Sequence, residues 1–190
     1  MNKAIFLDRD GTINIDKSYV YKREDFLYIE GVIDGLKRLQ DMGFLLVIIS
    51  NQSGIARGYY SEKDFESLTA WMIEDLRQKG INISGVYYCP HLPEGKLKKY
   101  AIHCDCRKPK TGLFFRAKEE LDIDLDHSFA MGDQLRDLSI TENTGVRGIW
   151  ITDANDEILE SSKIRKCSNF SAAVDMVADC NDGQERNLHE

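Results

Sequence analysis

Residues 44–49 form an uninterrupted apolar segment, Phe-Leu-Leu-Val-Ile-Ile, which ends at a polar stretch. A strand without polar alternation is stable only when both of its faces are buried, as they are in a parallel sheet covered by helices. Shorter apolar runs at 4–7, 85–88, 128–131 and 148–151 fit the same role. These segments therefore predict a buried sheet at the centre of the molecule.

The segments between these runs have the periodicity of helices. Apolar side chains recur at helical spacing over residues 32–42 and 65–76, and a further helix is expected over 111–121. Strands that alternate with helices of this length favour parallel pairing through crossover connections. We therefore expect an α/β fold, a doubly wound parallel sheet, with an edge strand at 164–167 and a helix at 170–177.

Several of the predicted strands end at side chains that can carry chemistry. Asp8 and Asp10 follow the first strand. Ser50 follows the second strand, and Asp133 follows a later one. Because ligands of open parallel sheets bind beyond the carboxyl ends of the strands, we expect these side chains to meet at one edge. Carboxylates from two strands can hold Mg²⁺, and Lys108 can add positive charge, so the set favours phosphoryl transfer.

A second cluster consists of residues that bind softer metal ions. Cys89 and His91 form one close pair, and Cys104 and Cys106 form another after a Lys-rich loop. Three thiolates and an imidazole suit tetrahedral structural Zn²⁺, with no position left for a catalytic water. The alternative is that these are ordinary reduced thiols of a surface loop, and His103 is a possible substitute ligand. We expect zinc, because the loop between the pairs needs something to order it.

The overall charge limits the partners that the chain can have. With 25 basic and 32 acidic residues the formal net charge is -7, the wrong sign for binding nucleic acid or an anionic membrane through a broad basic face. No apolar run is long enough for a signal peptide or a membrane span. We expect a cytoplasmic monomer with one domain over residues 1–180, a zinc loop at 89–106 and a frayed tail at 181–190.

Four motifs of the chain resemble those of the haloacid dehalogenase superfamily: Asp8-x-Asp10-Gly-Thr, Ser50-Asn51, Lys108, and Gly132-Asp133-x-x-x-Asp137. The resemblance implies a Rossmann-like phosphatase that works through an aspartyl-phosphate. It implies that Asp8 is the nucleophile and that Asp10 protonates the leaving alkoxide and then activates water. By the same resemblance, Ser50, Arg107 and Lys108 complete the catalytic set. It also implies Mg²⁺ bound by Asp8, the Asp10 carbonyl and Asp133, with the Gln134 carbonyl as a further ligand.

The Cys and His pairs narrow the resemblance to the zinc-bearing histidinol-phosphate phosphatase branch, without a large cap domain. The resemblance implies a sugar bisphosphate substrate, and contacts to it from Asp8, Asp10, Asp16, Lys17, Ser18, Tyr19, Ser50, Asn51, Gln52, Ser53, Arg107, Lys108 and Gln134. The most similar members usually carry Lys where this chain has Gln134, so that side chain brings no charge to the substrate. Two alternatives stay open: a phosphatase of histidinol phosphate, and a zinc-stabilised binding module without catalysis.

Overall fold

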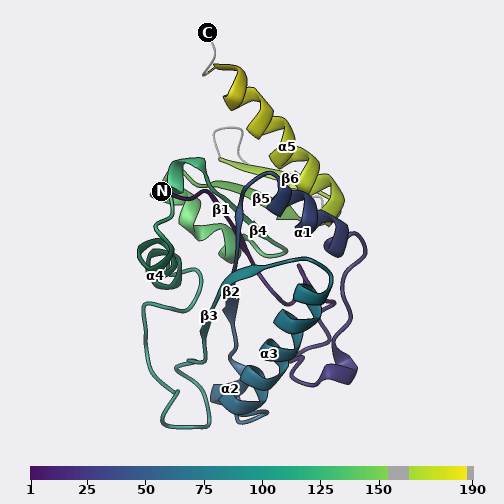
Figure 1. Ribbon diagram of the computed structural model, residues 1–190. Helices are drawn as coiled ribbons and strands as arrows, with labels where there is room; N and C mark the ends of the chain where they lie inside the picture. The colour runs from purple at the N-terminus through teal and green to yellow at the C-terminus, as the bar shows by residue number, and fades with distance from the viewer. Residues whose placement is uncertain (154–162, 188–190) are drawn as a thin grey trace.

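The computed structural model describes residues 1–153 and 163–187 and contains a six-stranded, entirely parallel sheet (Figure 1). The strand order is β3-β2-β1-β4-β5-β6, which confirms the predicted doubly wound parallel sheet. The strands are β1 (Ala4–Leu7), β2 (Leu45–Asn51), β3 (Ile83–Cys89), β4 (Phe129–Gly132), β5 (Arg147–Ile151) and β6 (Ile164–Cys167).

Helices cover both faces of this sheet. The α-helices of the chain are α1 (Val32–Asp41), α2 (Gly54–Arg57), α3 (Glu62–Gln78), α4 (Gly112–Leu121) and α5 (Phe170–Asn187). The 3₁₀ helices are η1 (Arg23–Asp25), η2 (Leu125–His127) and η3 (Leu135–Glu142). Ile5 and Leu7 of β1 pack into one core with α1, α3 and α5. Ala4 and Phe6 pack into the opposite core with α4 and η3. Figure 1 shows α1, α3 and α5 on one side of the sheet and α4 on the other. Within the described residues, no helix has the length and apolar character needed to cross a bilayer.

Two helix ends show how backbone conformation and side-chain contacts define the limits of a helix. Gly43, two residues after the end of α1, has a φ of 84°, a conformation that favours glycine. Ser61 caps α3: its hydroxyl accepts a hydrogen bond from the Asp64 backbone N–H at 3.2 Å, and the Asp64 carboxylate accepts one from the Ser61 backbone N–H at 2.8 Å. These local contacts satisfy backbone groups that the helix itself leaves unpaired.

Element ends differ from the prediction where the local signal is weak. Helix α5 continues to Asn187, so the tail expected to fray over 181–190 is helical as far as that residue, and 188–190 lie outside the described residues. Cys180, three residues beyond the predicted helix end at 177, packs against the core. Strand β3 begins at Ile83 rather than at residue 85. Helix α2 was not expected, because four residues are too few for a periodic pattern.

The order of the strands places the ends of β1, β2 and β4 side by side. Strand β2 lies on one side of β1 and β4 lies on the other. From β1 the chain first adds β2 and β3 on one side and then adds β4, β5 and β6 on the opposite side. Such a switch point opens a crevice beyond the carboxyl ends of the strands. Two long connections begin at this edge, residues 8–31 after β1 and residues 90–111 after β3. Among the described residues, no large cap domain covers the edge.

Candidate active site

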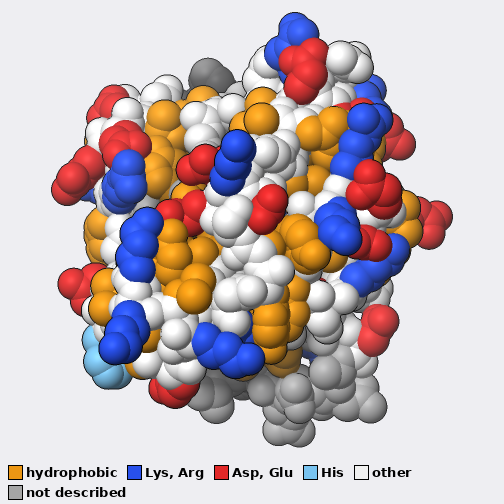
Figure 2. Space-filling view, turned by 90° about the horizontal axis from the view of Figure 1, so that it is seen from below, with side chains coloured by type: hydrophobic (Ala, Val, Ile, Leu, Met, Phe, Trp, Pro, Cys, Tyr) orange, Lys and Arg blue, Asp and Glu red, His pale blue; other side chains and the backbone are white. Residues whose placement is uncertain are grey.

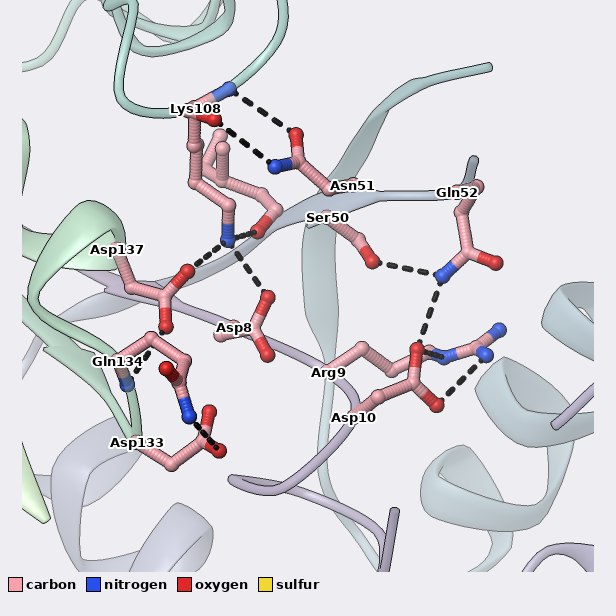
Figure 3. A network of polar contacts seen from close by, with 11 residues as sticks. Asp8, Arg9, Asp10, Ser50, Asn51, Gln52, Lys108, Asp133, Gln134 and Asp137 are labelled. Carbon is pink, nitrogen blue, oxygen red and sulfur yellow. Dashed lines mark hydrogen bonds and ion pairs between the residues drawn. The ribbon is translucent and has the colours of Figure 1, made fainter. Parts of the chain in front are cut away.

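Three carboxylates face one another beyond the ends of β1 and β4 (Figure 3). Asp8 follows β1 directly, Asp133 and Asp137 follow β4, and an oxygen of each lies within 4.8 Å of the others. Burial raises the pKa of Asp8 to about 7, against the lowering effect of Lys108. Burial likewise raises the pKa of Asp133. Converging acids with raised pKa values are typical of a reactive site or a cation site.

Lys108 supplies positive charge to this cluster (Figure 3). Its side chain is 1% exposed, and Nζ lies 2.6 Å from Asp8 Oδ1 and 2.8 Å from Asp137 Oδ1. Nζ also donates to the Ile49 carbonyl at 2.6 Å, so each of its three N–H groups has an acceptor. Burial alone would lower the pKa of Lys108, but the two carboxylates raise it above its ordinary value. Asn51 holds the Lys108 backbone through two hydrogen bonds, of 3.0 and 3.1 Å.

Asp10 has a separate set of partners. Its carboxylate accepts two hydrogen bonds from Arg9, at 2.8 and 3.1 Å, and one from Asn14 at 3.1 Å. Gln52 Nε2 donates to Asp10 Oδ2 at 3.0 Å and to Ser50 Oγ at 2.8 Å. The Gln52 amide therefore joins the end of β2 to the loop after β1, and the polar strand ends meet at one edge of the sheet.

An open cavity of about 340 Å³ lies over these side chains. Its lining includes these predicted contact residues: Asp8, Asp10, Asp16, Ser18, Tyr19, Asn51, Gln52, Ser53, Arg107 and Gln134. Lys17 is exposed and lies outside the lining, while Ser50 and Lys108 are buried beneath it. Sequence reasoning missed Tyr60 and Arg136, which also line the cavity. Tyr60 belongs to no motif, and Arg136 stands at an unspecified position of the motif that ends at Asp137.

The carboxylate cluster fits a divalent cation that prefers oxygen ligands. Asp8, Asp133 and Asp137 converge beside a single lysine, which leaves negative charge uncompensated. The backbone is shaped around Asp133: Gly11 has a φ of 94°, and a Cβ at this position would lie 2.5 Å from Asp133 Oδ2. Gln134 Nε2 donates to the same carboxylate at 3.2 Å, so this side-chain nitrogen is a donor and not a ligand atom. The predicted metal role of Gln134 therefore depends on its backbone carbonyl.

The predicted zinc ligands also come together. Cys89 Sγ lies 3.6 Å from Cys104 Sγ and 3.1 Å from Cys106 Sγ, and His91 Nδ1 lies 3.3 Å from Cys106 Sγ. The four ligand atoms lie within 4.8 Å of one another. A tetrahedral zinc ion with Zn–S bonds of about 2.3 Å places its sulfur atoms roughly 3.7 Å apart, so the spacing fits this metal. His103 does not belong to the group in the described part of the chain.

We expect about one zinc ion per chain in protein purified without chelator, and a lower Tm for Cys104→Ser. Because metal binding to a folded site adds to the free energy of unfolding, the Tm of Cys104→Ser should be lower than that of the wild type by on the order of 10 °C or more. Elemental analysis and thermal unfolding measure both quantities. Cys180→Ser, outside the cluster, is the control and should leave zinc content unchanged. Zinc-free protein with full activity and an unchanged Tm would contradict the assignment.

The parallel sheet, the carboxylate at the end of β1 and the buried lysine define a phosphatase of the haloacid dehalogenase type. The family model described as polynucleotide kinase 3 phosphatase matches residues 3–177, and the chain belongs to this family. Two curated relatives share a more specific name, D-glycero-beta-D-manno-heptose-1,7-bisphosphate 7-phosphatase. The protein from Haemophilus ducreyi is 47% identical, over 92% of this chain and 96% of its own length. The protein from Haemophilus influenzae is 54% identical over 73% and 74% of the two chains.

A solved structure supports the same assignment. The D,D-heptose 1,7-bisphosphate phosphatase from B. bronchiseptica, complexed with magnesium and phosphate, superimposes with a TM-score of 0.78. It is 28% identical in sequence, and the match covers 93% of this chain and 98% of that one. The resemblance drawn from the motifs is thereby confirmed over most of the chain.

Proposed function

We propose that this chain is a Mg²⁺-dependent phosphatase that removes the C7 phosphate from D-glycero-D-manno-heptose 1,7-bisphosphate. It would work in the cytoplasm, as a monomer with one domain over residues 1–180, on the route to nucleotide-activated heptose for the lipopolysaccharide core. The observation that carries the proposal is the Asp8 carboxylate, which lines an open cavity and is paired with buried Lys108. The names of the relatives support the choice of substrate.

In the first half of the reaction, an Asp8 oxygen attacks phosphorus and the bond to the C7 oxygen breaks. Asp10 gives its proton to that oxygen, so the sugar leaves as an alcohol and Asp8 carries an acyl phosphate. Lys108 and the hydroxyl of Ser50 lie beneath the cavity, where they stabilise charge on the transferred group. Heptose 1-phosphate is the released product.

In the second half, the Asp10 carboxylate takes a proton from water while the water oxygen attacks phosphorus. The bond to Asp8 breaks, which restores its carboxylate and releases inorganic phosphate. Asp10 is protonated again and ready for the next substrate. One side chain can serve both halves because the group that gives a proton in the first step is the base required in the second.

Asp8, Asp133 and the backbone carbonyls of Asp10 and Gln134 would hold Mg²⁺, which when bound supplies positive charge close to the phosphate oxygens. Asp137 is not among these ligands. Its carboxylate forms an ion pair with Lys108 at 2.8 Å and accepts a hydrogen bond from the Gln134 backbone N–H at 3.0 Å. It therefore braces the loop after β4 and compensates the lysine.

A bisphosphate needs positive charge at a second place. Arg57, Arg107 and Arg136 all line the cavity, although the whole chain carries a net charge of -7. On the face shown in Figure 2, basic and acidic side chains are interspersed among the coloured residues. The three guanidinium groups supply positive charge within the cavity, beside the five carboxylates that also line it. Histidinol phosphate, the alternative substrate, would bring a cationic amine toward these guanidinium groups and be repelled.

We expect a kcat/KM at least ~10-fold higher for heptose 1,7-bisphosphate than for histidinol phosphate. A bidentate guanidinium contact of Arg107 to the second phosphate is worth about 10- to 100-fold in affinity. Arg107→Ala should therefore shrink the ratio, whereas Arg77→Ala, in an exposed ion pair on α3, should not change it. Phosphate release with both substrates measures the ratio. Equal efficiencies would favour the histidinol phosphate alternative, and no turnover of either would favour a binding module.

A further inference from the structure

Arg9 stands between the two aspartates of the first motif and has no role in the reaction proposed above. It is nevertheless the largest of the fully buried side chains in the described part of the chain, with 1% of its surface exposed. We propose that Arg9 is a positioning residue, which fixes the orientation of the Asp10 carboxylate and links it to residues 16–20 at the cavity. This inference rests on the proposed function, because it takes Asp10 as the proton donor.

The first support is the geometry of the Arg9–Asp10 pair (Figure 3). Nε donates to Asp10 Oδ2 at 3.1 Å and Nη2 donates to Asp10 Oδ1 at 2.8 Å, so the guanidinium holds both carboxylate oxygens. A bidentate contact of this kind restricts rotation of the carboxylate, because turning it would break both bonds. The direction in which Asp10 faces is therefore set by its neighbour in the sequence.

The second support is a contact to the loop that lines the cavity. Nη2 of Arg9 also donates to the Val20 carbonyl at 2.7 Å. Val20 follows Ser18 and Tyr19, which line the cavity and have φ values of 60° and 69°. Non-glycine residues adopt this conformation only where other contacts hold the chain. One nitrogen of Arg9 thus contacts both the proton donor and the segment expected to meet the substrate.

The third support is the environment of the guanidinium. It lies over the Phe65 ring, 5.4 Å from the centroid, and Nη1 has no hydrogen-bond partner within the described residues. Burying a cation with an unsatisfied donor costs free energy that an apolar side chain of similar volume would avoid. Packing alone therefore does not explain an arginine at this position, whereas orienting Asp10 does.

The other partners of Asp10 show how the carboxylate can act without losing its orientation. Gln52 and Asn14 each donate a single hydrogen bond from a neutral amide group, of 3.0 and 3.1 Å. These are weaker than the paired, charge-assisted bonds from Arg9. When Asp10 gives its proton to the leaving group, the Gln52 bond to Oδ2 can be given up while both Arg9 bonds stay in place. Arg9 then keeps the carboxylate in place.

Single-turnover kinetics with two leaving groups tests this role. In Arg9→Met, transfer of the phosphate from heptose 1,7-bisphosphate to Asp8 should slow by ~10²-fold, because an alkoxide must be protonated as it leaves. Transfer from p-nitrophenyl phosphate should slow by less than about threefold, since p-nitrophenolate leaves without a proton. Arg9→Lys keeps the charge but cannot contact both oxygens, so it should show the same selectivity to a smaller degree. It also keeps the test open if Arg9→Met does not fold.

Two controls separate the possible failures. Arg23→Met removes an exposed arginine near the same loop, stacked on Trp71 at 5.0 Å, and should leave both rates unchanged. Asp10→Asn should show the leaving-group selectivity most strongly. If it does, and the Arg9 variants slow both substrates equally or neither, the positioning role is wrong and the proposed function stands. If Asp10→Asn shows no selectivity, the proton-donor role is wrong and the inference about Arg9 fails with it.

Discussion

Asp8→Asn is expected to lower the turnover by a factor on the order of 10³ or more while the chain stays folded. The amide keeps the shape of the carboxylate, and its oxygen can still accept the 2.6 Å hydrogen bond from Lys108. It lacks the negative charge that attacks phosphorus. Phosphate release at saturating substrate and Mg²⁺ measures the loss. Activity within tenfold of the wild type would exclude Asp8 as the nucleophile.

The stability of Asp8→Asn relative to the wild type is expected to depend on pH. In the folded chain the pKa of Asp8 is about 7, against an ordinary value of 3.8. Between these pH values the folded state binds a proton that the unfolded state has released, so stability falls as pH rises. Above pH 7 the full cost of the buried charge is present. In Mg²⁺-free buffer, the Tm of Asp8→Asn relative to wild type should therefore rise from pH 5 to pH 8, and a constant difference would contradict the burial argument.

Much of the fold could be predicted because its signals are local. The apolar run at 44–49 specifies a strand buried on both faces, and Ser61 marks the start of α3 through its own capping contacts. Where no local signal exists, the predicted ends of helices and strands were wrong. The residues after Val177 gave no sign that Cys180 packs against the core and that α5 continues to Asn187.

The site could be predicted only in part, for a related reason. Topology places Asp8, Ser50 and Asp133 at one edge, and that follows from the order of strands and helices. The direction of the Arg9 side chain depends on how the loop after β1 turns, which no spacing in the sequence encodes. Tyr60 similarly reaches the site through a hydrogen bond to the Gln52 side chain at 2.5 Å, a contact made by the turn around α2.

Lys108 links the two proposed metal sites of the chain. It lies two residues after Cys106 in the sequence, and its backbone is held by the Asn51 side chain at the end of β2. The loop that carries the cysteines therefore also delivers the ammonium group to Asp8. If zinc orders this loop, its removal should affect the position of the lysine as well as the stability of the fold.

Lys108→Met is expected to lower both turnover and stability. The substitution removes positive charge from the transferred phosphate, a kind of change that costs ~10²–10³-fold in turnover. It also leaves Asp8 and Asp137 buried without their cation, and breaking a buried pair in this way costs roughly 3–5 kcal/mol, or about 10 °C in Tm. Lys79→Met, which breaks the surface pair with Asp75, should change Tm little and serves as the control.

The double variant Lys108→Met/Asp8→Asn identifies the cause of the stability loss. If Lys108 stabilises the fold by compensating the buried carboxylates, removing one of them should restore part of the Tm. The double variant should then be more stable than Lys108→Met alone, although it has no activity. Thermal unfolding of the four proteins in Mg²⁺-free buffer gives the coupling free energy directly. Additive Tm changes would show instead that Lys108 acts through its packing and its 2.6 Å hydrogen bond to the Ile49 carbonyl, and not through the charge of Asp8.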